Sequence, residues 1–276
     1  MGKGEGKLGL MAFVGRGKDL VDVFKRTMSF GIPTCQLHCQ CDEADEVFSP
    51  ETVRAACEET GMEVTAITAG FRGQKYNNVD GPDTLGLVPP ALREERVALL
   101  KHFSDAVQPT GIENIVLHIG FIPDDETDPV YVSFIETMKD VCAYLKGNGQ
   151  NALVETGSEL ASTLRRTIGD IGADNFGVNF DTANVILYGK SNPLDCVELF
   201  GDRVRACHLK DGVWPNRDES LGHETPMGEG QVNFPVLIRR LKEKGFNGPW
   251  TIEREVSGPE QDEGIRKAIA LLAPLI

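Results

Sequence analysis

Long hydrophobic runs are absent from this sequence, and so is an excess of basic residues. No apolar run approaches the roughly 20 residues that a membrane-spanning helix needs, and the N-terminal MGKGEGKLGL lacks the apolar core of a signal peptide. Lysine and arginine total 28 against 42 aspartates and glutamates, which gives a net charge of −14. Such a surface repels phosphodiester backbones and anionic membranes. We therefore expect a cytoplasmic protein that binds neither nucleic acid nor a membrane.

Histidine is scarce and the cysteine count is odd, with five histidines and seven cysteines in 276 residues. An odd count in a chain of this length argues against a disulfide framework and favours reduced, buried thiols. The segment CQLHCQC brings Cys35, His38, Cys39 and Cys41 close together, which raises the alternative of a soft-metal site. No second ligand pair follows at zinc-finger spacing, so apolar packing of the thiols is the preferred interpretation.

Short apolar runs alternate with longer amphipathic segments along the whole chain. The predicted strands are 8–14, 34–38, 63–69, 114–119, 151–155, 176–181, 204–210 and 250–255, and the predicted helices are 18–31, 49–61, 93–108, 131–149, 158–169, 192–201, 234–245 and 262–273. Regular alternation of strand and helix predicts a parallel sheet. Eight such units are typical of an α/β (β/α)₈ TIM barrel, here a single domain over residues 1–276.

The alternative fold is an open, doubly wound sheet. That fold favours a glycine-rich turn after the first strand, and VGRGKD (14–19) lacks the third glycine of the dinucleotide-binding pattern. The barrel is therefore the better prediction.

Four successive predicted strands end in side chains suited to binding a cation. Because side chains alternate along a strand, Glu155, Asp181, His208 and Glu253 are all expected to point into the barrel. Active sites of such barrels lie at the carboxyl ends of the strands. Three carboxylates converging there would repel one another unless a cation neutralised them. The oxygen-rich set favours one divalent metal ion, Mn²⁺ or Mg²⁺, with Co²⁺ or Zn²⁺ as alternatives.

These residues lie in the motifs LVETGS, GVNFDTANVILYG, ACHLKDG, PMGEGQVNF and PWTIERE. With them, nearly the whole chain resembles the xylose isomerase-like TIM barrel superfamily. It is most similar to the branch of tagatose and psicose 3-epimerases, hydroxypyruvate isomerases and inosose dehydratases. The resemblance implies that Glu155, Asp181, His208 and Glu253 bind the metal and that Glu155 and Glu253 are the catalytic acid/base pair.

The resemblance implies a sugar or sugar phosphate isomerase or epimerase, with proton transfer by two glutamates through a metal-bound enediolate. That chemistry agrees with the residues, because a carboxylate on each face of a carbon can remove a proton from one side and return one from the other. Two alternatives are an inosose dehydratase-type lyase and a barrel that binds a sugar or metal without turnover. A DNA-processing barrel of the endonuclease IV type is disfavoured by the acidic charge and the few histidines. A homo-oligomer is an open alternative.

Departures from the tagatose-epimerase pattern affect the predicted substrate contacts. Asn184 stands where that pattern has a histidine, and Trp214 stands where it has an arginine, with Arg217 three residues beyond. Lys210 and His118 are predicted to point inward, so each is a candidate substrate contact or a structural group. The predicted substrate-binding residues are therefore His118, Asn184, Lys210, Trp214 and Arg217.

Two long segments without a regular pattern, 70–90 and 211–231, follow strands and are expected to overhang the barrel mouth. The second is a candidate substrate lid or a solvated surface loop. Its GEG glycines (228–230) offer backbone N–H groups that are able to donate hydrogen bonds to a phosphate.

Overall fold

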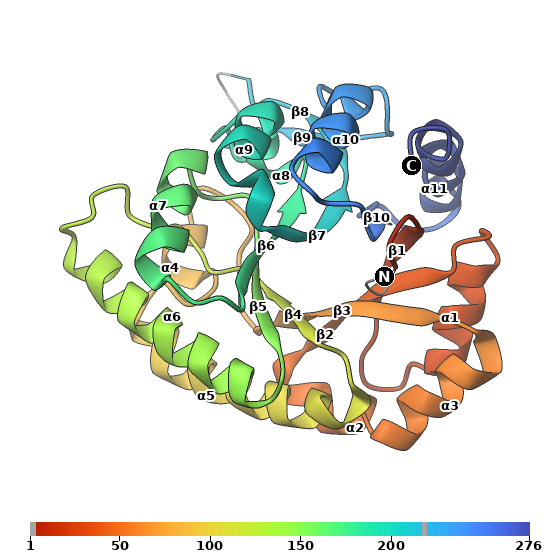
Figure 1. Ribbon diagram of the computed structural model, residues 1–276, viewed down its shortest axis with the longest axis horizontal. Coiled ribbons are helices and arrows are strands. Elements are labelled where there is room, and N and C mark those ends of the chain that lie inside the picture. The colour runs from red at the N-terminus through yellow and green to blue at the C-terminus, as the bar shows by residue number, and fades with distance from the viewer. Residues whose placement is uncertain (1–3, 217–219) are drawn as a thin grey trace.

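Eight parallel strands close into a barrel in the computed structural model, which describes residues 4–216 and 220–276. The order around the ring is β1-β10-β7-β6-β5-β4-β3-β2, and the helices lie outside it (Figure 1). The strands are β1 (Leu8–Phe13), β2 (Thr34–Gln40), β3 (Glu63–Gly70), β4 (Asn114–Leu117), β5 (Asn151–Glu155), β6 (Phe176–Asp181), β7 (Val204–Leu209) and β10 (Trp250–Ile252). Each overlaps a predicted strand, with β2 and β3 ending two residues and one residue later than predicted, so the prediction of a (β/α)₈ barrel is confirmed.

The main helices follow the strands in turn. They are α1 (Leu20–Met28), α3 (Pro50–Thr60), α5 (Pro90–Val107), α6 (Pro129–Gly147), α7 (Ala161–Ile171), α9 (Pro193–Phe200), α10 (Phe234–Glu243) and α11 (Pro259–Leu272). Helix α3 shows why they begin and end where they do. The Ser49 hydroxyl accepts the Thr52 N–H at 3.1 Å, Pro50 occupies the first turn, and Gly61 ends the helix at φ 74°.

Helix α7 begins at Ala161, three residues later than predicted. The Ser158 hydroxyl instead donates to the Gly120 carbonyl at 3.0 Å, and Glu159 is buried. Ser158 and Glu159 therefore make tertiary contacts in the loop before α7. The helical pattern of the sequence gives no sign of these contacts.

Short elements connect the main strands and helices. The small helices are α2 (Ala44–Val47), α4 (Gly81–Thr84) and α8 (Asn184–Leu187), and the 3₁₀ turns are η1 (Cys41–Glu43), η2 (Gln108–Thr110) and η3 (Gly201–Arg203). Strands β8 (Asp211–Val213) and β9 (His223–Thr225) pair antiparallel. The sequence did not predict this hairpin, because three residues a side are too few for a recognisable alternation.

The barrel interior is filled in layers. Ala66, Val116, Leu153 and Ala206 form a small apolar cluster, separate from the large core between the strands and the helices. Next to it the interior becomes polar, with Gln36, Asn179 and Thr251 fully buried and hydrogen-bonded to one another through the Gln36 amide. The predicted inward register of these strands is therefore confirmed, and it carries the polar side chains toward the mouth.

The cysteine-rich segment does not gather into a metal site. Cys35 and Cys39 pack in the core on the helix side of β2, whereas His38 points to the opposite side and lines the barrel mouth. Alternation along the strand keeps the imidazole and these thiols on opposite faces. None of the seven cysteines, all within the described ranges, forms a disulfide. The preferred prediction of apolar packing is confirmed.

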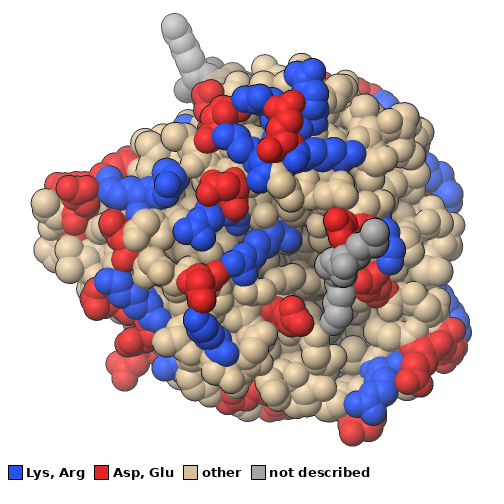
Figure 2. Space-filling model, in the orientation of Figure 1, with Lys and Arg blue, Asp and Glu red and all other residues tan. Residues whose placement is uncertain are grey.

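Acidic and basic side chains are interspersed over the face drawn in Figure 2. Within residues 4–216 and 220–276, no helix is both long enough and apolar enough to cross a membrane.

Candidate active site

The four predicted ligands meet at the carboxyl ends of four neighbouring strands. One ligand atom from each of Glu155, Asp181, His208 and Glu253 lies within 4.8 Å of the others, and all four side chains are buried. Strand pairing places Asp181 directly beside His208, because the two are partners in the β6–β7 register. Glu253 follows β10, where its N–H donates to the Leu209 carbonyl at 3.1 Å.

His208 connects this cluster to the barrel interior. Its Nδ1 lies 3.0 Å from Glu155 Oε1 and 3.5 Å from Glu253 Oε2. Its Nε2, on the other edge of the ring, lies 2.9 Å from Gln36 Oε1. The ring is therefore held between the carboxylates and the buried amide.

Lys210 projects into the same cluster from just beyond β7. Its Nζ lies 3.0 Å from Asp181 Oδ2, 2.9 Å from Glu253 Oε2 and 3.1 Å from Glu255 Oε1, and its side chain is fully buried. The sequence left a choice between a substrate contact and a salt bridge at the rim. The structure shows that the pairs with Asp181 and Glu253 are buried, whereas Glu255 is exposed at the mouth.

Charge is shared unevenly among these groups. Burial disfavours the charged form of each, yet Lys210 and His208 together hold the pKa of Glu253 well below its usual range. Burial also opposes charge on Lys210, but the neighbouring carboxylates, Asp181 first among them, raise its pKa. For Asp181, burial and repulsion from Glu253 and Glu155 outweigh Lys210 and raise the pKa. The protein thus balances its buried charges with two cations and a proton.

The cluster fits a divalent metal ion. Asp181 Oδ2 is buried and, apart from its ion pair with Lys210 Nζ, has no hydrogen-bond partner among the described residues, while Asp181 Oδ1 accepts the N–H groups of Ala183 and Asn184 at 2.9 and 2.7 Å. One oxygen therefore fixes the carboxylate and the other is available as a ligand. Three carboxylates and one imidazole are a donor set that suits Mn²⁺ or Mg²⁺.

A cavity of about 370 Å³ lies in the barrel mouth above the cluster. Its lining is Met11, Phe13, His38, Gln40, Tyr76, His118, Glu155, Asn184, Leu187, Tyr188, Leu221, Gly222, Glu224, Glu253 and Glu255. Glu155 and Glu253 reach the cavity, whereas Asp181 and His208 are fully buried and do not line it. The two glutamates are therefore the cluster members that a molecule in the cavity would touch.

Two predicted substrate contacts line this cavity and others do not. His118 and Asn184 are part of the wall, and His118 Nε2 lies 3.4 Å from Glu155 Oε2. Trp214 is 37% exposed and lies outside the lining. Arg217 falls outside the described residues.

Several lining residues received no role from the sequence. His38 and Gln40 both point inward from β2, as the alternation of side chains along a strand requires. Tyr76 lies in a segment without periodicity, where its ring packs edge-on against His118 with 5.1 Å between centroids. Tyr188 ends the apolar run after Asp181, and no sequence signal separates it from a core residue.

An ion pair and a hydrogen bond hold the hairpin formed by β8 and β9 beside the barrel mouth. The buried Arg254 Nη1 lies 2.7 Å from Glu224 Oε1, and Glu224 Oε2 accepts the Glu255 N–H at 3.1 Å. Because Glu224 also lines the cavity, the hairpin contributes directly to the site. The other predicted loop contributes Tyr76, and Asn78 Nδ2 joins the two segments by donating to the Ser220 carbonyl at 2.5 Å.

The N–H groups of the GEG segment already have a partner. Asp211 Oδ2 accepts the Gly228 and Gly230 N–H groups at 2.8 and 3.0 Å, and Asp211 Oδ1 accepts those of Gly212 and Val232. A Cβ at Gly230 would lie 2.1 Å from Asp211 Oδ1, so the loop closes tightly around the carboxylate. The Asp211 carboxylate thus occupies the position that a phosphate was predicted to take beside these glycines.

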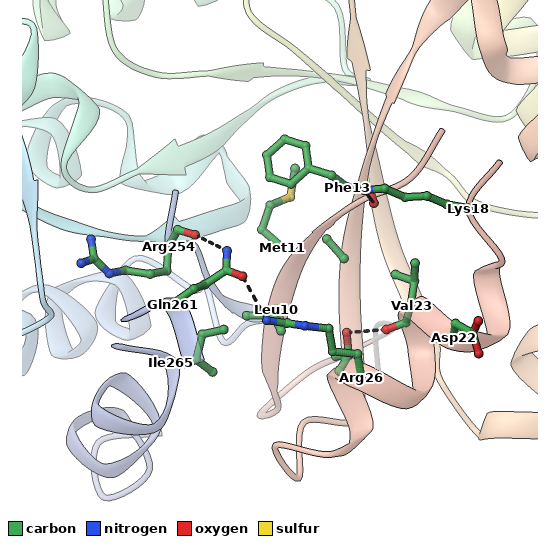
Figure 3. A pocket seen from close by; sticks show the side chains of 12 residues that line it. Leu10, Met11, Phe13, Lys18, Asp22, Val23, Arg26, Arg254, Gln261 and Ile265 are labelled. Carbon is green, nitrogen blue, oxygen red and sulfur yellow. Dashed lines mark hydrogen bonds between the residues drawn. The ribbon is translucent and has the colours of Figure 1, made fainter. Parts of the chain in front are cut away.

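A second cavity, of about 350 Å³, lies between β1, α1 and α11 (Figure 3). Its polar groups are joined to one another, since Arg26 Nη2 donates to Gln261 Oε1 and Gln261 Nε2 donates to the Arg254 carbonyl. Lys18 Nζ likewise donates to the Phe13 carbonyl at 2.9 Å. These contacts leave the barrel mouth, with its aligned carboxylates, as the stronger candidate site.

Comparison with known proteins identifies the family to which the chain belongs. Residues 24–275 match the family model described as the xylose isomerase-like TIM barrel. The crystal structure of a xylose isomerase domain protein from Planctomyces limnophilus is 33% identical, with a TM-score of 0.89 over 98% of this chain and 97% of that one. A D-allulose 3-epimerase from Methylomonas sp., solved in complex with D-allulose, shares the fold at 15% identity, with a TM-score of 0.66 over 100% of this chain and 99% of that one.

Curated relatives match over shorter stretches. An uncharacterized protein of Methanocaldococcus jannaschii is 28% identical in an alignment of 190 residues that covers 60% of each protein. An inosose dehydratase of Lacticaseibacillus casei is 25% identical in an alignment of 112 residues that covers 36% of this chain and 37% of the dehydratase. These matches span less than two thirds of the relatives' length. With the family model covering most of the sequence, the chain belongs to the xylose isomerase-like TIM barrel family.

Proposed function

We propose that this protein is a divalent-metal-dependent sugar or sugar phosphate isomerase or epimerase, with Glu155 and Glu253 as its proton-transferring groups. The observation that carries the proposal is the exposure of these two carboxylates to the cavity while Asp181 and His208 stay buried behind them. Strands β6 and β7 separate β5 from β10 in the ring, so the two glutamates approach from different sides.

The two carboxylates are held in their ionised form. Burial opposes their ionisation, but His118 and His208 lower the pKa of Glu155, and Lys210 and His208 lower that of Glu253. Each is therefore held as the carboxylate, the form that removes a proton from carbon. A carboxylate that has accepted a proton is in turn the acid that returns it.

Glu155, Asp181, His208 and Glu253 would hold the cation, Mn²⁺ or Mg²⁺ in preference to Co²⁺ or Zn²⁺. When bound, a divalent cation supplies Lewis-acid stabilisation of the negative charge that develops on a substrate carbonyl oxygen. His118 and Asn184 would contact substrate hydroxyl groups from the wall of the cavity. Lys210, Trp214 and Arg217 remain proposed contacts. For Trp214, contact would require the segment after β8 to approach the mouth.

A dehydratase reaction is the second candidate, because the two glutamates that line the cavity would also supply an acid and a base. Loss of a hydroxyl next to a carbonyl needs both, because one group removes the proton and the other protonates the departing oxygen. A barrel that binds its ligand without turnover is the third candidate.

Turnover in D₂O distinguishes these candidates. The Mn²⁺-loaded protein is incubated with ketoses, ketose phosphates and cyclic polyol ketones, and the products are analysed by NMR and mass spectrometry. Isomerisation or epimerisation should place deuterium on the carbon next to the carbonyl, whereas dehydration should lower the product mass by one water.

Glu155→Gln and Glu253→Gln should each slow turnover by at least about 10²-fold, the lower range for loss of a general acid or base. Glu113→Gln, on the surface, is the matched control. If no compound exchanges a C–H proton with solvent, the isomerase and epimerase proposal is wrong. If exchange occurs but a glutamine variant with full metal content keeps the wild-type rate, the two-glutamate assignment is wrong.

A further inference from the structure

Gln36 is a buried amide for which the family motifs assign no role. It lies in the middle of β2, has no exposed surface, and extends across the barrel interior to β6, β7 and β10. Burying an amide is unfavourable unless its hydrogen bonds are satisfied. An apolar cluster of Ala66, Val116, Leu153 and Ala206 fills the adjacent interior, so the fold does not require polarity there. We therefore infer that the amide of Gln36 has a function other than packing.

The partners of Gln36 fix which way its amide points. Gln36 Nε2 lies 3.3 Å from Asn179 Oδ1, 3.2 Å from Thr251 Oγ1 and 3.5 Å from the Cys207 carbonyl oxygen. A backbone carbonyl accepts hydrogen bonds and never donates them, so the –NH₂ end belongs on this side. The carbonyl end, Gln36 Oε1, then faces His208 Nε2 at 2.9 Å.

An amide oxygen has no hydrogen to donate, so the hydrogen in this contact must be on His208 Nε2. Nδ1 points into the carboxylate cluster, 3.0 Å from Glu155 Oε1 and 3.5 Å from Glu253 Oε2. Carboxylates also cannot donate, so without a metal Nδ1 carries a hydrogen too and the ring is an imidazolium. A cation bound in the cluster would take the place of the Nδ1 hydrogen, and the retained Nε2–H would leave the Nδ1 lone pair to that cation. The buried amide and the carboxylates thus act on opposite edges of one ring.

We propose that Gln36 is a positioning residue that holds His208 in its Nε2–H tautomer and thereby presents the Nδ1 lone pair to the metal. This inference rests on the proposed function, because it requires a cation among Glu155, Asp181, His208 and Glu253. Gln36 itself contacts neither metal nor substrate. Partners of metal-binding histidines commonly change metal affinity about 10–100-fold when they are replaced.

The test measures Mn²⁺ affinity by calorimetry in four variants. Gln36→Leu removes the acceptor at similar volume, Gln36→Asn withdraws it by one methylene, and Gln36→Glu restores an acceptor. Thr34→Val is the matched control, because Thr34 is equally buried on β2 but donates to the Leu8 carbonyl at 2.9 Å. We expect Gln36→Leu and Gln36→Asn to weaken Mn²⁺ binding about 10–100-fold. Gln36→Glu should recover most of the affinity, and Thr34→Val should match the wild type.

A spectroscopic measurement separates tautomer control from general loosening. In Zn²⁺-loaded protein with ¹⁵N-labelled histidine, His208 should show a protonated Nε2 and a metal-bound Nδ1. Gln36→Leu should shift the two ¹⁵N signals of His208 or broaden them through exchange between tautomers. Thr34→Val should leave both signals unchanged. If Gln36→Leu fails to fold, Gln36→Asn supplies the same comparison.

The outcomes distinguish this inference from the proposed function. If folded Gln36→Leu or Gln36→Asn binds Mn²⁺ as tightly as the wild type, Gln36 has no positioning role and the metal proposal stands. If wild-type His208 carries its proton on Nδ1 in the loaded protein, the tautomer assignment is wrong. If the wild type binds neither Mn²⁺ nor Zn²⁺, both the inference and the proposed function are overturned.

Discussion

The ammonium of Lys210 lies 3.0 Å from the carboxylate of Asp181, and neither side chain has any exposed surface. Glu253, 2.9 Å from the same nitrogen, belongs to the candidate metal cluster as well. Lys210 therefore neutralises charge that a divalent cation would also neutralise. Its contribution to stability should consequently depend on whether a metal is bound.

Lys210→Met should destabilise the metal-free protein by about 3–5 kcal/mol, because it leaves buried carboxylates without their cation. Added Mn²⁺ should recover part of the loss by supplying positive charge in the same cluster. Melting temperatures with EDTA and with Mn²⁺ measure both effects. Lys146→Met, which removes an exposed partner of Asp174, is the control and should change little in either condition. Equal destabilisation of Lys210→Met with and without Mn²⁺ would contradict a metal in this cluster.

Asp181→Asn should lower metal occupancy while the fold is retained. An asparagine oxygen at the Oδ1 position still accepts the N–H groups of Ala183 and Asn184. Its –NH₂ group replaces Oδ2, the oxygen that is available to a cation, and an amide nitrogen does not bind one. Elemental analysis of protein purified with Mn²⁺ checks the result, with the exposed Asp174→Asn as control. Unchanged metal content in Asp181→Asn would remove this residue from the ligand set.

Glu224→Gln should loosen the hairpin beside the mouth. Glu224 and Arg254 form an ion pair whose side chains are only 10% and 6% exposed, so its loss should cost up to about 3 kcal/mol. Protease cleavage between β8 and β9 should therefore become faster in Glu224→Gln. Glu46→Gln, in an exposed pair with Arg16, is the control.

If the segment is a substrate lid, substrate should slow cleavage of the wild type between β8 and β9. Substrate should also change the fluorescence of Trp214, which is obtained by subtracting the fluorescence of the Trp214→Phe variant. Cleavage that is identical with and without an active substrate would leave the segment an ordinary loop.

Glu159→Gln should stabilise the protein at alkaline pH. Burial raises the pKa of Glu159 to about 7, from an ordinary value of 4.5. A carboxyl whose pKa is raised by folding is accommodated best when protonated, so stability falls as the pH rises from about 4.5 to 7 and then levels. The difference corresponds to about 3 kcal/mol. Glutamine stays neutral and avoids this loss.

Urea unfolding at pH 5 and pH 8 measures the effect of Glu159→Gln. The variant should gain stability over the wild type at pH 8 and little at pH 5, while the surface variant Glu113→Gln should follow the wild type at both. A gain of the same size at both pH values would show that the carboxyl does not titrate in this window.

Local sequence determined the strands, their alternation and therefore which side chains enter the barrel. Glu155, Asp181, His208 and Glu253 could be identified because the two-residue period is a property of the extended backbone and needs no knowledge of the neighbours. The same property explains why Cys35 and Cys39 could not join His38 in a metal site. The helix boundaries at Ser49 and Gly61 were also predictable from local sequence, because capping residues bond to or terminate the backbone of the helix next to them.

Tertiary structure decided which of these side chains meet. Gln36 and His208 are 172 residues apart, and Lys210 reaches Asp181 and Glu253 only because β6, β7 and β10 are neighbours in the closed ring. The depth at which side chains meet depends on strand register, which shifts between Val178 and Asn179 on β6. Asp211 accepts N–H groups from Gly228, Gly230 and Val232, and Glu224 joins the cavity wall, only because the segment 223–232 returns to β8. Alternation in a strand tells which face a side chain occupies, whereas ring closure and register set its partners, because those distances run across strands and not along the chain.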